Sequence, residues 1–410
     1  MVKKRGLENA SIFLPMNLKN KKVAILGWGV DTQDVAPWLE KQGAKITILD
    51  ESKGDKFENL DQYDLLVRSP GVYRYRKEFE GLNITSKTKL FFDLCPAKII
   101  GVTGTKGKGT TSTLIYEILK AAGEDVYLGG NIGIGLFDFL PKLTKDSWVI
   151  LELSSFQLID LDKSPHIAVV LMVTSEHLNW HKSTQEYVDA KKNIVAHQKS
   201  SDYAIVNKDY PNSVEIGKTA RGKVIWISGK DINLETRLRG DHNKENIAAA
   251  AAVAKIINVP YKEVVKNFKG LEHRLEEVKI VNGATFINDS FSTIPETTIA
   301  AIKSFSEPII LIVGGSSKNS DFATLSKAIN ETKNIKLIID IGLEGPRIVR
   351  EVRGVRVIRG ERNMEKIVNL AYNNAVSGDV VLLSPACASF DMFKSYKDRG
   401  QQFKDAVRKL

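Results

Sequence analysis

Three times along the 410 residues, a short apolar run rich in β-branched residues passes directly into a glycine-rich turn. In chain order the pairs are Val23–Leu26 with Gly27-Trp28-Gly29, Ile99–Val102 with Thr103-Gly104-Thr105-Lys106-Gly107-Lys108, and Ile309–Val313 with Gly314-Gly315-Ser316. In doubly wound α/β sheets, ligands bind where strands of this kind end. Each pair therefore predicts the start of its own α/β unit, with a ligand at the carboxyl ends of its strands.

The rest of the chain extends this pattern. Further apolar runs predict strands, and amphipathic stretches between them predict helices: Lys45–Leu49, Leu65–Val67, Trp148–Leu151, Ala168–Val173, Leu337–Ile341 and Val380–Leu383 as strands; Ser112–Ala122, Thr184–Ala196, Asn243–Ile257 and Met364–Ala375 as helices. Continuous apolar strands separated by helices favour parallel sheets that are buried on both faces.

We therefore expect an α/β protein of three domains, each a largely parallel doubly wound sheet, since 410 residues are too many for one core. The expected domains are a Rossmann-like N-terminal domain (1–97), a central domain like the phosphate-loop ATPases (98–273) and a Rossmann-like C-terminal domain (274–410).

Charge and cysteine content narrow the function. Lys and Arg number 59 against 49 Asp and Glu, a surplus of +10 that suits anionic small molecules. The surplus is spread along the chain, which argues against nucleic acid as a partner. Two cysteines make no disulfide framework, and we find neither a secretory signal nor a membrane span. We expect a cytoplasmic, monomeric enzyme.

The strongest local signal lies between the second predicted strand and its helix: Gly104, Thr105, Lys106, Gly107, Lys108, Gly109 and Thr110. Glycines let backbone N–H groups surround phosphate oxygens, and a lysine reaches the β and γ phosphates. The strict phosphate-loop pattern has glycine where this chain has Val102, and Ser or Thr where it has Gly109. A surface turn rich in Gly and Lys remains the alternative.

The first glycine turn is weaker evidence. It lacks the third glycine of a dinucleotide fingerprint, so nucleotide binding and a plain strand-to-helix turn both remain open. Asp50, which follows the next strand, is placed to bind a ribose or a base.

An ordered set of further motifs follows the phosphate loop: Gly129-Gly130-Asn131-Ile132-Gly133, Leu151-Glu152-Leu153-Ser154-Ser155-Phe156-Gln157-Leu158, Glu176-His177, Gly240-Asp241-His242-Asn243-Lys244-Glu245-Asn246, His273-Arg274 and Asn288-Asp289-Ser290. In this order they resemble the Mur ligase family, the ATP-dependent ligases that build the peptide stem of peptidoglycan. Ser69-Pro70-Gly71 and Ser384-Pro385-Ala386-Cys387-Ala388-Ser389-Phe390-Asp391 resemble the members that add D-glutamate to UDP-N-acetylmuramoyl-L-alanine through an acyl phosphate.

The resemblance implies roles for individual residues. Catalysis would fall to Lys108, Glu152, His177, Lys191 and Asn131. ATP would be bound by residues 104–110 together with Asn243, Asn246, Arg274 and Asp289. The UDP-sugar would meet Thr32, Asp50, Ser69, Gly71, Asn131, Ser154 and Gln157. Glutamate would meet Thr293, Lys318, Ser389, Phe390 and Tyr396.

The resemblance also implies two Mg²⁺ sites, held by Thr110, Glu152, His177 and a carbamylated Lys191. Simpler interpretations stay open for each residue type. Glu152 could pair with a lysine, His177 could be a structural hydrogen-bonding group, and Lys191 could be an ordinary solvated lysine beside Lys192. Asn243 could cap a helix, and Phe390 and Tyr396 could belong to a core.

Three residues depart from the family pattern. Gly109 stands where a hydroxyl is expected, Lys106 where Asn or Asp is common, and Phe291 where a lysine near ATP is common. The run Ser292-Thr293-Ile294-Pro295-Glu296 also resembles relatives that attach L-glutamate. The alternatives are therefore L-glutamate as the substrate, another ligase of the family such as a folate polyglutamate ligase, or a nucleotide-binding regulatory protein without catalysis.

Overall fold

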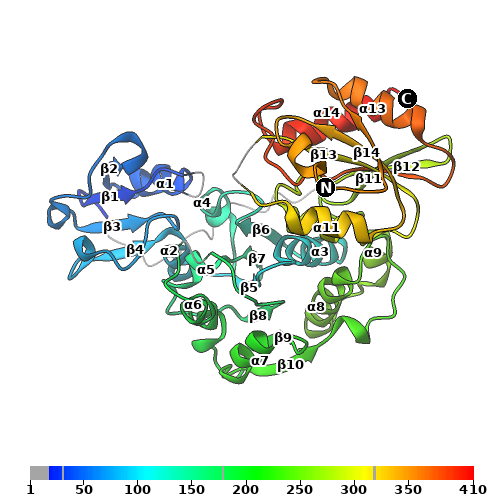
Figure 1. Ribbon diagram of the computed structural model, residues 1–410. Helices are drawn as coiled ribbons and strands as arrows, with labels where there is room; N and C mark the ends of the chain where they lie inside the picture. The colour runs from blue at the N-terminus through cyan, green and yellow to red at the C-terminus, as the bar shows by residue number, and fades with distance from the viewer. Residues whose placement is uncertain (1–17, 30–31, 178–179, 317–319) are drawn as a thin grey trace, which may run out of the picture. The chain divides into compact units, whose positions relative to one another are not determined.

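The computed structural model describes residues 18–29, 32–177, 180–316 and 320–410 (Figure 1). The chain divides into two units, one of residues up to 232 together with 245–261, and one of residues 233–244 together with 262–410. Three sheets form the framework, two in the first unit and one in the second.

The first sheet is entirely parallel and has the strand order β2-β1-β3-β4. Its strands are β1 (Lys22–Leu26), β2 (Lys45–Leu49), β3 (Leu65–Arg68) and β4 (Ile84–Ser86), with helices α1 (Val35–Lys41) and α2 (Lys87–Leu94). Strand β3 is buried along its whole length, which explains its unbroken apolar start.

The central sheet is also entirely parallel, in the order β10-β9-β8-β5-β7-β6. Its strands are β5 (Lys98–Thr103), β6 (Val126–Gly130), β7 (Trp148–Glu152), β8 (Ile167–Val170), β9 (Tyr203–Asn207) and β10 (Lys223–Ile227). Its helices are α3 (Lys108–Ala121), α4 (Leu136–Phe139), α5 (Ser155–Leu158), α6 (Thr184–Ala196), α7 (Pro211–Lys218) and α8 (His242–Ile257).

The third sheet has the order β11-β12-β16-β13-β14-β15, and all its pairs are parallel except the edge pair β11 with β12. Its strands are β11 (Glu276–Val281), β12 (Ala284–Asn288), β13 (Ile309–Gly314), β14 (Ile335–Ile341), β15 (Arg356–Arg359) and β16 (Val380–Leu383). The helices are α9 (Lys262–Asn267), α10 (Pro295–Ile302), α11 (Ala323–Glu331), α12 (Gly345–Val349), α13 (Met364–Asn374) and α14 (Tyr396–Arg408).

The predicted α/β class with largely parallel sheets is confirmed. Each of the three predicted strand-to-glycine turns lies at the carboxyl end of a parallel strand, namely β1, β5 and β13. Helix α3 begins at Lys108, four residues before the predicted Ser112, and β8 ends at Val170 rather than at Val173.

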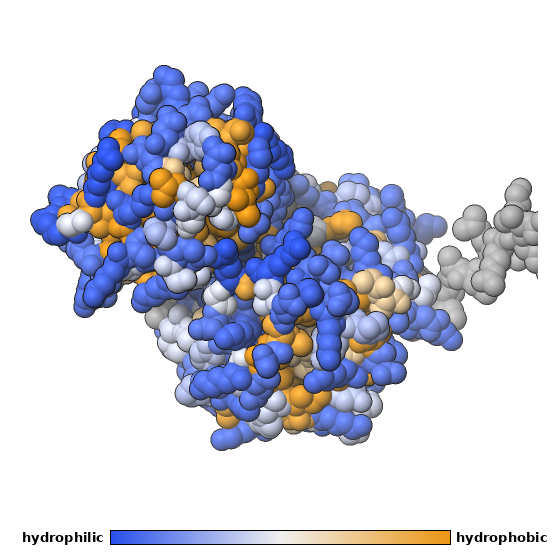
Figure 2. Space-filling view, turned by 90° about the vertical axis from the view of Figure 1, so that its right-hand side faces the viewer, coloured by the Kyte–Doolittle hydropathy of each residue, from blue (hydrophilic) through white to orange (hydrophobic). Residues whose placement is uncertain are grey.

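The surface is mainly polar. Figure 2 shows that hydrophilic residues cover most of one face, with apolar residues in small groups between them. Within the part of the chain that the structure describes, no helix is both long enough and apolar enough to cross a bilayer.

Candidate active site

The carboxyl edge of the central sheet gathers the predicted catalytic residues. The phosphate loop follows β5, Asn131 follows β6, Glu152 is the last residue of β7, and His177 lies beyond β8. These four strands are parallel, so their carboxyl ends share one edge. The Asn131 amide donates to the carbonyl of Glu152 at 3.1 Å, which joins the ends of β6 and β7.

Two glycines of the phosphate loop are required by space. Gly107 has φ +87°, and a Cβ there would lie 2.4 Å from Asn246 Oδ1. A Cβ on Gly104 would lie 2.9 Å from the Cβ of Leu171. The loop then ends in the N-terminus of the 14-residue helix α3, where unpaired amides and the helix dipole favour an anion. This geometry leaves the loop the close backbone turns that the predicted phosphate site requires.

The two loop lysines differ in environment. Lys108 folds back over the loop, and its Nζ donates to the carbonyls of Gly104 at 3.0 Å and Thr105 at 3.2 Å. Lys106 is exposed and pairs with Glu176 at 2.7 Å. Lys106 stands where the family commonly has Asn or Asp, and it therefore adds a positive charge to the loop. The carboxylate of Glu176, which follows β8, pairs with this charge.

Helix α6 places a buried lysine behind the loop. The Lys191 side chain is buried, and its Nζ donates to Thr103 Oγ1 and to the Gly104 carbonyl, both at 3.1 Å. Burial, with the Lys108 charge as a second cause, holds the pKa of the Lys191 amine well below its ordinary value, although Glu176 and Glu152 act in the opposite direction. The amine is thereby biased toward the neutral form, the form that reacts with CO₂.

The neighbouring lysine has none of these features. Lys192 pairs with Asp189 at 2.8 Å and Glu215 at 2.6 Å, and these partners raise its pKa. Of the two lysines, the geometry therefore favours Lys191 as the one that is carbamylated.

The donor set at this edge fits a hard cation in part. Glu152 is buried with 8% of its surface exposed, and Thr110 is buried in the first turn of α3. A buried carboxylate and a hydroxyl supply the oxygen donors that Mg²⁺ prefers. Lys191 adds an oxygen donor only as a carbamate, because its side chain carries no oxygen of its own. Among the described residues, no group of three or more His, Cys, Asp or Glu side chains forms a metal cluster by itself.

His177 lies in a strained turn, with φ +59°. Its Nε2 is 3.6 Å from Glu176 Oε2, and its ring packs 4.9 Å from that of Phe156. Burial lowers the pKa of His177, with Glu176 opposing and Lys108 reinforcing the shift. A neutral imidazole is the form that can bind a metal.

The two predicted adenine-binding residues of α8 have different surroundings. Asn246 is buried, and its Oδ1 accepts from Thr111 Oγ1 at 3.1 Å, beside Gly107. Asn243 lies one residue inside the helix and donates to the Arg239 carbonyl at 2.7 Å. Since an N-cap side chain accepts from an amide, this bond does not cap the helix.

The first sheet gathers Thr32, Asp50, Ser69 and Gly71 beyond its carboxyl ends. Asp50 accepts from the Trp28 amide at 3.1 Å and from Ser52, and the Ser52 bonds lower its pKa. Thr32 is fully buried and closes the first glycine turn by donating to Gly27 and Gly29 carbonyls. Ser154 and Gln157 form a capping box at the start of α5.

The third sheet gathers the remaining predicted residues in the second unit. Asp289 is buried and accepts from Ser384 Oγ at 2.7 Å and from the Leu275 amide at 3.2 Å. The Arg274 guanidinium lies 3.7 Å from the centre of the Phe291 ring, and Phe291 packs edge-on against Tyr396. Phe291 stands where the family commonly has a lysine near ATP. The Arg274 guanidinium therefore places a different cation against the residue at this position.

Of the predicted glutamate-binding residues, Ser389 is buried, Thr293 and Tyr396 are partly buried, and Phe390 is 74% exposed. The exposed ring is at the surface of this unit rather than in a core. Lys318 lies outside the described residues.

Two residues that contact the candidate site were given no role in the sequence interpretation. Tyr187 is buried, and its hydroxyl lies 2.9 Å from Thr105 Oγ1. Its i, i+4 spacing from Lys191 was the available signal. His181 is buried with Nε2 2.9 Å from Ser155 Oγ, but it lies outside any helix and gave no periodic signal.

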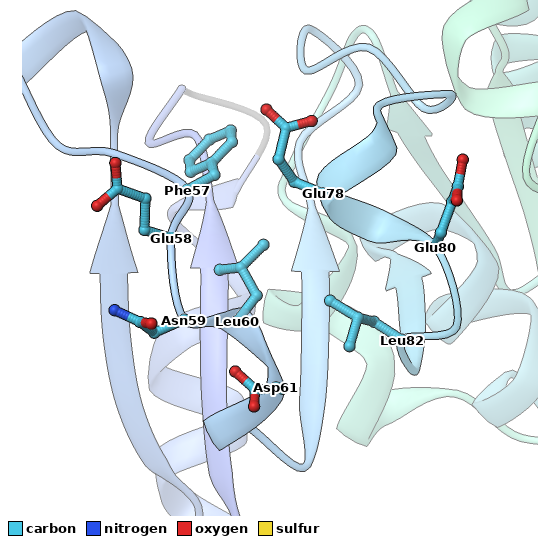
Figure 3. Close-up of a pocket in the computed structure, with 8 residues that line it drawn as sticks. All are labelled: Phe57, Glu58, Asn59, Leu60, Asp61, Glu78, Glu80 and Leu82. Carbon is cyan, nitrogen blue, oxygen red and sulfur yellow. The ribbon is translucent and has the colours of Figure 1, made fainter.

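A separate cavity of about 520 Å³ lies over one face of the first sheet (Figure 3). Its lining residues are Phe57, Glu58, Asn59, Leu60, Asp61, Glu78, Glu80 and Leu82. Four carboxylates and no cation in that lining would repel a phosphate, so this cavity does not serve an anionic ligand.

The fold and this edge define a nucleotide-dependent α/β enzyme, and comparison with known proteins supplies the family. Residues 102–224 match the Mur ligase middle domain, and residues 273–387 match the glutamate ligase domain of Mur ligases. The UDP-N-acetylmuramoylalanine--D-glutamate ligase of Acetivibrio thermocellus is 38% identical, across 96% of this chain and 97% of that protein. The ligase of the same name from Clostridium tetani is 36% identical, across 95% and 97%.

Solved structures agree on the fold. The MurF ligase of Thermotoga maritima in complex with ADP has a TM-score of 0.61 at 16% identity, with 97% of each chain covered. UDP-N-acetylmuramate-alanine ligase MurC from the same organism has a TM-score of 0.62 at 16% identity, covering 95% of this chain and all of that one. The protein belongs to the Mur ligase family of ATP-dependent amide ligases.

Proposed function

We propose that the protein joins D-glutamate to UDP-N-acetylmuramoyl-L-alanine, with ATP converted to ADP and phosphate, in the cytoplasmic synthesis of peptidoglycan precursors. Two observations carry the proposal. Relatives named for this reaction align with almost the full length of the chain, and the phosphate loop of the chain has a cradle geometry with Lys108 folded over it.

In this proposal, the alanine carboxylate attacks the γ-phosphorus of ATP and ADP leaves. The glutamate amine then attacks the acyl phosphate, loses a proton, and expels inorganic phosphate from a tetrahedral intermediate. Such chemistry depends on positioning and charge neutralisation more than on a protein nucleophile. Lys108 neutralises the β and γ phosphates, the amides of residues 104–110 hold them, and Asn131 orients the carboxylate or the γ-phosphate.

Two Mg²⁺ ions would be held by Thr110 and Glu152 at one site, and by His177 with a carbamylated Lys191 at the other. When bound, the ions would supply charge neutralisation for the transferred phosphoryl group. Asn243, Asn246, Arg274 and Asp289 would bind the rest of ATP.

The other two substrates would bind at the first sheet and at the third sheet. Thr32, Asp50, Ser69, Gly71, Ser154 and Gln157 would bind the nucleotide sugar, together with Asn131. Thr293, Lys318, Ser389, Phe390 and Tyr396 would bind glutamate. The division into domains 1–97, 98–273 and 274–410 and the monomeric state belong to the same proposal.

The names of the relatives favour D-glutamate over L-glutamate. The regulatory alternative rested on Gly109 and Phe291. Two observations weaken it, since Thr110 follows Gly109 in the first turn of α3, and Arg274 stacks on Phe291 and so keeps a cation nearby.

A single assay tests the proposal. The protein is incubated with ATP, Mg²⁺, UDP-N-acetylmuramoyl-L-alanine and each enantiomer of glutamate, and phosphate release is measured. We expect release with D-glutamate and background with L-glutamate. Release only with L-glutamate would reverse the stereochemical assignment, and background with both enantiomers would remove the proposed reaction.

A further inference from the structure

The most deeply buried cation of the first sheet has a role that the reaction outlined above does not use. Arg68, the last residue of β3, is fully buried, and so is its ion-pair partner Asp160, which follows α5. Removing a guanidinium from water costs several kcal/mol, and hydrophobic replacements of buried ion pairs are often equally stable. Arg68 Nε is also buried with no hydrogen-bond partner in the described structure. Stability alone therefore does not explain an arginine here.

The guanidinium binds the loop that follows it. Nη1 donates to the carbonyls of Ser69 at 3.1 Å and Pro70 at 3.3 Å, and also to the Val72 carbonyl. The remaining carbonyl of the loop, that of Gly71, accepts from Trp180 Nε1 at 3.3 Å. Each carbonyl from residue 69 to residue 72 thus has a side-chain donor within reach. The two hydrogens of Nη1 are shared among three of these carbonyls, and the Ser69 carbonyl also accepts from the Val72 amide at 3.1 Å.

Fixed carbonyls imply fixed amides. In a trans peptide the C=O and the following N–H point in opposite directions, and no described peptide of the chain is cis. Because the Pro70 and Val72 carbonyls point at the buried guanidinium, the amides of Gly71 and Tyr73 point away from it. These two amides lie on either side of the Val72 amide, which donates to the Ser69 carbonyl at 3.1 Å, and two amides that point outward at the carboxyl end of a sheet can donate to an anion.

The second terminal nitrogen of the guanidinium, Nη2, contacts residues in and just after α5, a helix of the central sheet. Nη2 donates to the Phe156 carbonyl at 3.2 Å and to Asp160. Phe156 lies in α5, four residues after Glu152 and one before Gln157. One side chain therefore connects the loop beyond β3 with the segment that follows the candidate metal-binding carboxylate.

We propose that Arg68 is a positioning residue for the nucleotide sugar: it directs the Gly71 and Tyr73 amides toward the diphosphate and holds their loop in register with α5. This inference rests on the proposed function, because it takes the nucleotide sugar to bind beyond β3. Arg68 itself does not touch the substrate.

Two variants separate positioning from simple packing. Arg68→Met removes the Arg68–Asp160 ion pair and the bonds to the loop carbonyls. Asp160→Asn removes that ion pair and the second one that Asp160 makes with Arg74, and leaves the carbonyl bonds of Arg68 in place. Binding of UDP, which carries the diphosphate, is measured by calorimetry, with native circular dichroism as a condition. We expect Arg68→Met to weaken UDP binding about tenfold. Asp160→Asn should weaken UDP binding by less than about threefold, which corresponds to a loss of less than roughly 1 kcal/mol of binding free energy.

ATP binding is the internal control, since it belongs to the central sheet and should change less than about twofold in either variant. Equal losses of UDP affinity in the two variants, or unchanged affinity in Arg68→Met, would overturn the inference. Failure of the wild-type protein to bind UDP would count against the proposed function instead.

The wild-type chain provides a second test that needs no variant, in case Arg68→Met does not fold. UDP should slow hydrogen exchange of the Gly71 and Tyr73 amides. Exchange at these amides that is the same with and without saturating UDP would contradict the proposed orientation of the loop.

Discussion

Lys191 beside the central sheet and Arg399 beside the third sheet are both buried basic residues, but their surroundings differ. Lys191 Nζ has two acceptors in the phosphate loop region, Thr103 Oγ1 and the Gly104 carbonyl. Arg399 donates to four, namely Ser290 Oγ and the carbonyls of Ser290, Cys387 and Ala388.

The difference appears in their titration. Burial lowers the pKa of Arg399 only to about 10, so it remains a cation at neutral pH. The pKa of Lys191 falls well below its ordinary value. A guanidinium with a full set of acceptors holds two loops together, while an amine with few acceptors and a cationic neighbour becomes available for chemistry. Burial alone therefore does not identify a reactive lysine. The nearby charges also differ, since Lys108 lowers the pKa of Lys191 further, whereas Cys387, Asp391 and Asp289 oppose the effect of burial on the pKa of Arg399.

Removing Lys108 should have the largest effect, because it is the cation over the loop and also a cause of the Lys191 shift. We expect Lys108→Ala to lower phosphate release by about a thousandfold or more with native circular dichroism. Lys120→Ala, at the other end of α3, is the matched control and should stay within about twofold of wild type. A Lys108→Ala rate near that of wild type would mean that the phosphate cradle is elsewhere.

The pair Lys191 and Lys192 sharpens the comparison within one helix. Lys191→Met should lower turnover roughly 100-fold, because a group in the phosphate site is lost. Lys192→Met should change it by less than about twofold, since only surface ion pairs are lost. Steady-state phosphate release, with ¹³C-labelled bicarbonate and NMR to detect the carbamate in the wild type, checks both. A larger loss of turnover in Lys192→Met than in Lys191→Met would mean that Lys192, and not Lys191, is the lysine of the site.

For Arg399 we predict a structural effect. Arg399→Met leaves several buried acceptors unsatisfied and should weaken the third sheet by about 3 kcal/mol. Arg399→Lys keeps a charge but lacks the planar fork, and should fall between that variant and wild type. Hydrogen exchange of β12 and β16 measures this directly. Unchanged protection in Arg399→Met would show that the four bonds contribute little.

Asp289 gives a pH test of the same unit. Burial raises its pKa from 3.8 to about 6, so the folded state favours the protonated carboxyl. Its stabilising contribution is complete below pH 3.8, is lost as the pH rises through about 6, and leaves a cost of about 3 kcal/mol at neutral pH. Asp289→Asn should therefore flatten the change in β12 and β16 protection between pH 4 and 7. A slope equal to that of wild type would assign the titration to other groups.

The sequence predicted the fold class and the three strand-to-glycine turns, because an apolar strand and a glycine turn occur together at β1, β5 and β13. The strands that were not predicted are β4, β6, β9, β10, β11, β12 and β15. Of these, β11 and β15 are edge strands with charged residues, such as Glu277 and Arg356, that give no apolar run. The order of the candidate catalytic residues was visible along the chain. Their partners were not, since Lys191 and Thr103 or Arg68 and Asp160 are about 90 residues apart and only the parallel topology brings them together.

A structure of the protein crystallised with Mg²⁺ and a non-hydrolysable ATP analogue tests the central claim most directly. The account predicts the triphosphate at the N-terminus of α3, with Lys108 on its β and γ phosphates and a metal ion on Glu152. A triphosphate bound anywhere else, with the loop of residues 104–110 making no contact to it, would contradict the account.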